Sequence, residues 1–146
     1  RTICGAKSSC LFHKSPYGLV ETQMFLNAAT QLYPLIISVN LTQNSYFLMK
    51  HQGICSVNVP ENGEYGQLLS LGRSFVHPDD KNTFLYNLSR ENLLKLYKNG
   101  NRMLTFRSRQ KVEKGGSWFQ VTTHVLFIEN PNQSDVLEIT MSRING

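Results

Sequence analysis

Segments in which apolar and polar residues alternate constrain the fold of this chain more than any other feature. In residues 35–41, apolar side chains at the odd positions alternate with Ile36, Ser38 and Asn40. Successive side chains of a β-strand point to opposite faces of a sheet, so this pattern predicts a half-buried strand. A polar turn at 42–45 makes it a hairpin with the next strand. The remaining predicted strands are 46–50, 102–111, 117–128 and 136–144.

Other segments have a helical period instead. Apolar residues at i, i+3, i+4 and i+7 predict a helix over 21–33 that ends before Pro34; these residues are Phe25, Ala28, Ala29 and Leu32. Between the second and third strands, helices are predicted at 68–76, where Gly72 interrupts the pattern, and at 77–88 and 89–98. Ser89 is a favourable N-cap for the last helix, and Asn99-Gly100 ends it. Residues 51–66 are predicted to be a loop, with a short strand at 54–57 as an option.

The order of these elements indicates the fold class. A helix, two strands, a helical crossover and three strands form an α+β layout, and consecutive hairpins imply mostly antiparallel pairing. A length of 146 residues suits one such domain. We expect residues 1–20 to be a lead-in segment and residues 21–146 to form the domain. Because the sequence begins at Arg1 rather than Met, we also expect it to be a piece of a larger protein.

Composition excludes several classes of function. The formal net charge is +5, a mild basic excess. In the basic stretch 95–114, Arg107 and Arg109 lie on the same side of a predicted strand, and no aromatic residues are interleaved with them on that side. A solvated strand face is therefore favoured over a nucleic-acid site. No apolar stretch is long enough to span a membrane, and no contact of this chain with a membrane is expected. The three cysteines and four histidines lack the spacing of a disulfide framework or a metal site, so no metal is expected.

Two interpretations of His77-Pro78-Asp79-Asp80 are open: a catalytic His–Asp cluster, or the start of a helix. Proline is well tolerated in a first helical turn, and carboxylates interact favourably with the positive end of the helix dipole. The chain has neither a phosphate-binding glycine loop nor a nucleophile elbow. We therefore favour a structural helix cap, in which Asp79 or Asp80 accepts a hydrogen bond from a backbone N–H of the first turn. No enzymatic activity is expected of this chain.

The order of motifs resembles that of PAS domains. His77-Pro78-Asp79-Asp80 is similar to the HPDD motif that opens a helix in one large PAS subfamily, and it is followed here by the basic strand 105–109 and the turn Gly115-Gly116-Ser117-Trp118-Phe119. Residues 84–94 resemble PAS sensors that precede GGDEF cyclase domains in Gram-positive bacteria. The resemblance covers residues 21–144. It implies a five-stranded sheet in the order 2-1-5-4-3 and a cytoplasmic sensory module attached to a diguanylate cyclase or, as second choice, a histidine kinase.

The resemblance also implies a site. PAS folds often hold a cavity between the sheet and the helical crossover, and the apolar set that we expect to face it is Ile37, Val39, Leu104, Phe106, Phe119, Val121 and Ile139. A small-molecule ligand of unknown identity is one interpretation, and a filled core is the other. No cofactor is predicted: no histidine can be assigned to the inner face of the crossover to bind haem, and the reactive-cysteine pattern of flavin-binding relatives is absent.

The predicted helix at 21–33 must bury its apolar face, since an isolated helix of this length is marginal in water. We predict a homodimer built on Met24, Phe25, Ala28 and Leu32, with Trp118 and the outer sheet face as its floor. Two other functions stay open. One is a dimerisation PAS domain without a ligand, and the other is a small α+β enzyme of the ketosteroid-isomerase or cystatin kind.

Overall fold

The computed structural model describes residues 31–52, 58–111, 115–129 and 134–145. Nearly all of these belong to one compact unit, Tyr33–Gly146. The predicted lead-in segment, the domain boundary at residue 21 and most of the helix predicted at 21–33 lie outside the described residues. The last two described residues before that unit, Gln31 and Leu32, are helical.

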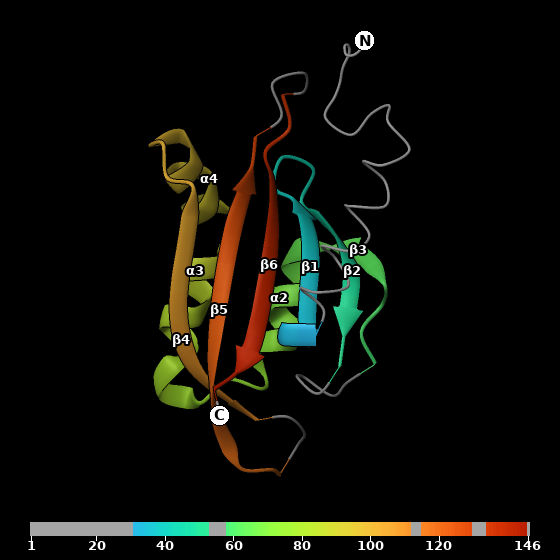
Figure 1. Ribbon diagram of the computed structural model, residues 1–146, viewed down its shortest axis with the longest axis vertical. Helices are drawn as coiled ribbons and strands as arrows, with labels where there is room; N and C mark the ends of the chain where they lie inside the picture. The colour runs from blue at the N-terminus through green and yellow to red at the C-terminus, as the bar shows by residue number, and fades with distance from the viewer. Residues whose placement is uncertain (1–30, 53–57, 112–114, 130–133, 146) are drawn as a thin grey trace. The chain divides into compact units, whose positions relative to one another are not determined.

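An antiparallel sheet of six strands runs through the described part of the unit (Figure 1). Its spatial order is β3-β2-β1-β6-β5-β4. Without the short edge strand β3, this is the order 2-1-5-4-3 expected from the sequence, so the α+β class and the topology are confirmed and the strand count was one too low. The strands are β1 (Leu35–Asn40), β2 (Ser45–His51), β3 (Asn62–Glu64), β4 (Met103–Lys111), β5 (Trp118–Ile128) and β6 (Leu137–Ile144).

The additional strand, β3, lies where the sequence predicts a loop. Its three residues, Asn-Gly-Glu, pair with Ser45, Tyr46 and Phe47 of β2. None of the three has a strong preference for strands, so the pairing depends on the exposed edge that β2 offers rather than on local sequence. The strand considered at 54–57 lies within residues 53–57, which the structure does not describe.

The helices pack on one face of the sheet, which we call the inner face (Figure 1). They are α2 (Tyr65–Arg73), the 3-10 turn η1 (Pro78–Asp80), α3 (Lys81–Leu88) and α4 (Arg90–Lys98). The helix predicted at 68–76 starts earlier, where the Tyr65 N–H donates to the Asn44 carbonyl at 3.0 Å. It runs through Gly72 and ends before Phe75, whose carbonyl accepts from the Lys111 N–H of β4 at 2.9 Å.

Local signals set the bounds of α4 as predicted. The Ser89 hydroxyl accepts a hydrogen bond from the Asn92 N–H at 3.1 Å, which satisfies one of the free N–H groups of the first turn. At the other end, Gly100 adopts a φ of 89°, a left-handed conformation that favours glycine. Both signals act within one helical turn, which is why they can be recognised in the sequence.

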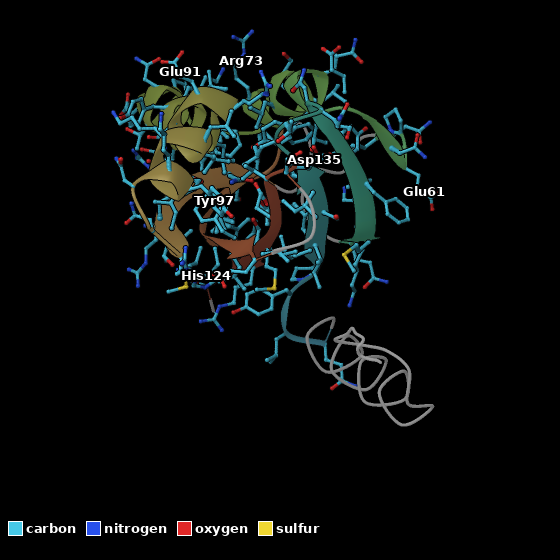
Figure 2. The ribbon with its side chains drawn as sticks, turned by 90° about the horizontal axis from the view of Figure 1, so that it is seen from above. Glu61, Arg73, Glu91, Tyr97, His124 and Asp135 are labelled. Carbon is cyan, nitrogen blue, oxygen red and sulfur yellow. The ribbon has the colours of Figure 1, made fainter. Side chains whose placement is uncertain are left out.

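The core lies between the inner face and the helices. Phe84, Leu88 and Leu93 of the helices are buried with Val125 and Phe127 of β5. Figure 2 shows the unit from one end: Tyr97 points from α4 toward the sheet, Arg73 and Glu91 point away from it, and His124 lies on the opposite, outer face. The Tyr97 ring lies 5.7 Å from that of Phe127, between centroids. The two sheet faces therefore differ, and the inner one is available to form a site.

Candidate functional site

A cavity of about 70 Å³ lies between the inner face of the sheet and helices α2 and α3. Its walls are apolar and include Leu68 and Leu69 of α2, Phe84 and Leu88 of α3. Its floor on the sheet carries polar side chains, namely Gln110, Thr123, Thr140 and Ser142. A cavity with apolar walls and a few polar groups on one side is typical of small-molecule sites.

The close packing of α2 on α3 shapes one wall of the cavity. Gly72 lies in the last turn of α2 and faces Phe84 of α3. A Cβ atom at position 72 would meet the Phe84 ring at 3.6 Å, which is ordinary van der Waals contact. Gly72 and Phe84 both line the cavity, so we expect a methyl group at position 72 to reduce its volume.

A β-bulge brings His51 into the same site. Register between β1 and β2 shifts by one residue, so that Ile36 pairs with Lys50 but Ile37 pairs with Leu48. Because side chains alternate along a strand, this shift turns His51 to the inner face opposite Leu35, and both line the cavity. Sequence reasoning missed His51, because without the bulge its position would point to the outer face.

The polar groups of the floor form hydrogen bonds with one another or with neighbouring polar side chains. The hydroxyls of Thr123 and Ser142 lie 2.8 Å apart, and the Gln110 amide donates to the Ser108 hydroxyl at 2.9 Å. The Thr140 hydroxyl donates to Oε1 of Glu138 at 2.7 Å. These pairs reduce the cost of burying polar atoms, which would otherwise disfavour this floor.

Glu138 is the most unusual group next to the cavity. Its side chain is fully buried, and its Oε2 has no hydrogen-bond partner among the described residues. Burial raises the pKa of Glu138 to about 8, against a smaller lowering by the Thr140 hydrogen bond. The pKa of Tyr65 is also raised, first by burial and then by the charge of Glu138. The Tyr65 hydroxyl donates to the Leu88 carbonyl at 2.6 Å.

The structure places most of the predicted inner set on the inner face. Ile37 lines the cavity, and Leu104 and Phe106 pack against the core. Val39 and Val121 are buried in the interior. Phe119, the second residue of β5, lies on the inner face like Val121, but its side chain is 41% exposed.

Ile139 was assigned to the wrong face. Ile37 pairs with Thr140 across β1 and β6, so the inward phase of β1 puts Glu138, Thr140 and Ser142 inside and Ile139 outside. The apolar residues of β6 alternate in phase with its outer face, where Leu137, Ile139 and Met141 are half-buried. The sequence pattern identified the period of this strand but not its buried side. Polar residues on the buried side supply the cavity floor.

The His77-Pro78-Asp79-Asp80 segment joins the helices to the sheet. His77 is the N-cap, and its Nδ1 accepts from the Asp79 N–H at 3.1 Å. Contrary to the sequence prediction, Asp80 accepts from the N–H, Nε and Nη2 of Arg109 in β4 at 2.8, 3.0 and 3.0 Å, not from the first turn. These bonds lower the pKa of Asp80 to about 2.

The residues predicted for a dimer are only partly described. Met24, Phe25 and Ala28 lie outside the described residues. Trp118 is on the outer face and 40% exposed. Its ring lies 4.8 Å from that of His77, between centroids, and the Lys111 Nζ lies 5.0 Å from its centroid. These contacts within the chain hold the indole at the end of β5.

Within the described ranges, no group of three or more His, Cys, Asp or Glu side chains is arranged to hold a metal ion. In the same ranges, no helix has the length and hydropathy needed to cross a membrane.

Solved structures are similar to this chain at low sequence identity. A sensory box histidine kinase/response regulator from Burkholderia thailandensis E264 is 13% identical, with a TM-score of 0.51 over 85% of this chain and 83% of that chain. The N-terminal domain of a diguanylate cyclase with a PAS/PAC sensor from Marinobacter aquaeolei is 12% identical, with a TM-score of 0.49 over 75% of this chain and 93% of that chain. A PAS domain from a two-component sensor histidine kinase is 12% identical, with a TM-score of 0.45 over 87% and 98%.

The first of these likenesses, together with the strand order, shows that the chain has a PAS fold. At 13% identity it shows the fold alone. No protein-family model matches the chain, and no curated protein sequence matches it significantly.

Proposed function

We propose that the chain is the sensory module of a bacterial signal-transduction protein, in which a small molecule binds the cavity and changes an attached output domain. The observation that carries this proposal is the cavity itself, with apolar walls from α2 and α3 above a polar sheet floor. Such a lining can bury the apolar surface of a ligand while a few hydrogen bonds fix its orientation. The PAS fold is consistent with this role.

The size of the cavity limits its occupant. About 70 Å³ is roughly half the ~150 Å³ of a cavity that holds benzene. The ligand is therefore very small, or α2 moves outward when it binds. A ligand that binds one position of α2 more tightly than another shifts the population between them, and this shift is the signal in our proposal.

The rest of the assignment depends on the sequence resemblance. We propose membership of the HPDD-containing PAS subfamily, a cytoplasmic location and a diguanylate cyclase as the output domain, with a histidine kinase as the second choice. A homodimer would let one signal act on two output domains together.

A pair of glycine variants tests the ligand site. Gly72→Ala places a methyl group at the cavity, whereas Gly66→Ala adds one on α2 away from it, where a Cβ atom would meet Oε1 of Glu64 at 3.6 Å. Alanine is the better helix former by about 0.5–1 kcal/mol, so both variants are expected to melt at or above the wild-type temperature. Small uncharged compounds found by thermal shift are then titrated by calorimetry.

We expect Gly72→Ala alone to weaken binding, by about tenfold or more, because its methyl group occupies cavity volume. Hits that bind all three proteins equally would lie elsewhere on the surface and would contradict the proposed site. Finding no hit that depends on residue 72 would favour a dimerisation domain without a ligand.

A further inference from the structure

The carboxyl group of Glu138 is buried next to the cavity without a charged partner. Its side chain is 0% exposed, and Oε2 has no hydrogen-bond partner among the described residues. Within the described ranges, no cation forms an ion pair with it. An unpaired buried carboxylate is costly, so the group stays only where the surrounding structure tolerates its neutral form or uses its charge.

Among the described residues, the Glu138 side chain has one hydrogen bond, from the Thr140 hydroxyl. Its neighbours in register, Val39 of β1 and Phe127 of β5, are apolar. The charge of Glu138 acts on Tyr65 of α2, whose hydroxyl hydrogen is donated to the Leu88 carbonyl. From α4, the Arg90 guanidinium donates to the carbonyls of Leu41 and Thr42. Among these groups, the Thr140 hydroxyl is the contact through which Glu138 can affect the cavity.

Thr140 connects the carboxyl group to the cavity. It lines the cavity, and its hydroxyl lies 2.7 Å from Oε1 of Glu138. A hydroxyl has one hydrogen to donate and lone pairs to accept with. An ionised carboxylate only accepts, so it takes this hydrogen and leaves the Thr140 lone pairs for a ligand.

Protonation of Glu138 reverses this arrangement. A proton on Oε1 can be donated to the Thr140 oxygen, which frees the hydroxyl hydrogen for a ligand. Oε2 then remains as a carbonyl oxygen without a partner, which proteins tolerate more often than a donor without a partner. The proton is therefore expected on Oε1 rather than on Oε2.

We infer that Glu138 acts through Thr140 as a proton-linked positioning residue that sets the specificity of the cavity. In its ionised form it selects small uncharged ligands with a hydrogen-bond donor, and in its protonated form it selects ligands with an acceptor. This inference rests on the proposed function, since it requires that the cavity binds a ligand. The raised pKa of Glu138, about 8, centres the change near pH 8.

Pyrrole and furan form a suitable pair of probes, because the two rings are similar in size and differ in having an N–H donor or an oxygen acceptor. Dissociation constants are measured for the 146-residue chain at pH 6 and pH 9.5, from NMR shifts of the Ile37 and Leu69 methyl groups. His51, a second titratable side chain on the lining, is controlled with His51→Gln. Urea unfolding checks that each variant is folded.

We expect the wild type to prefer furan at pH 6 and to shift toward pyrrole at pH 9.5, with the affinity ratio changing about three- to tenfold, as the loss of one hydrogen bond predicts. His51→Gln and Thr140→Ser should keep this change. Glu138→Gln and Thr140→Val should abolish it while still binding the probes, because each removes one member of the pair.

The outcomes separate the inference from the proposed function. If both probes bind but their ratio is the same at the two pH values, or changes equally in Glu138→Gln, the inference is wrong and the ligand cavity stands. If His51→Gln abolishes the change, His51 is its source, and the inference is again wrong. If neither probe perturbs the methyl groups at either pH, the cavity admits no small ring with a single donor or acceptor, and the inference is wrong. The proposed function also allows a smaller ligand, and the Gly72→Ala titrations decide it separately.

Discussion

At the scale of single residues, Glu138 makes the stability of the fold depend on pH. Burial raises its pKa from 4.5 to about 8, so the folded chain holds a proton that the unfolded chain loses. The contribution of protonated Glu138 to the stability of the folded chain is fully present below pH 4.5 and is lost as the pH rises toward 8. Over this interval the free energy of unfolding falls by at most about 1.4 kcal/mol per pH unit.

Glu138→Gln should remove this dependence. The amide cannot ionise. Between pH 5 and pH 8, the free energy of unfolding of the variant is therefore expected to rise by about 2–4 kcal/mol relative to that of the wild type. Urea unfolding at a series of pH values measures the difference. The exposed Glu61→Gln is the matched control, because its side chain faces water (Figure 2). Parallel curves for the wild type and Glu138→Gln would show that Glu138 titrates as an ordinary carboxyl group.

Residue-scale features were also the hardest to predict from the sequence. Alternation predicted that Ile37, Val39 and Val121 face the interior, because in β1 and β5 the apolar phase is the buried one. In β6 the buried phase is polar, and only the register with β1 reveals it. His51 enters the site through a bulge that local sequence does not encode.

At the scale of elements, Asp80 joins the start of α3 to β4. Two of its three bonds from Arg109 involve the guanidinium and the third the backbone N–H, so one carboxylate fixes both the side chain and the strand. The sequence predicted a helix start here, and the chain does enter η1 and α3 at Pro78. It did not predict the partner of Asp80, because Arg109 is 29 residues away in the chain.

Asp80→Asn is expected to lower the melting temperature by several degrees at pH 7, since an amide keeps only part of this charge-assisted contact. The pKa of Asp80 is lowered from 3.8 to about 2 by its hydrogen bonds to Arg109, so its stabilising contribution is present above pH 3.8 and is lost as the pH falls to 2. The difference in melting temperature between the variant and the wild type should therefore become smaller as the pH falls through this interval, which thermal unfolding measures.

The neighbouring Asp79→Asn serves as control. Its side chain is 76% exposed, and its oxygen lies 3.9 Å from Arg109, so a change of less than about one degree is expected. Equal effects of the two substitutions would contradict a specific role for Asp80 and would indicate a general effect of negative charge at the helix start.

At the scale of the whole molecule, the outer face of the sheet is the surface on which we expect two copies of the chain to associate. Large apolar side chains on this face are partly exposed: Met103 at 56%, Trp118 at 40% and Ile128 at 37%. Polar groups interrupt them, and the hydroxyl of Thr105 lies 2.8 Å from Nδ1 of His124. A surface of this mixed kind is typical of contacts that form and separate, so we expect a weak dimer rather than a permanent one.

The dimer prediction can be tested at the helix expected from residues 21–33. Phe25→Glu puts a charge on its apolar face, whereas Gln23→Glu puts the same charge on the opposite side of the same helix. A charge buried in an interface without a partner is unfavourable, so we expect Phe25→Glu to be monomeric and Gln23→Glu to dimerise like the wild type. Sedimentation equilibrium over a range of concentrations measures the masses. A wild type that stays monomeric at millimolar concentration contradicts the dimer, because its apolar helix must then be covered within one chain.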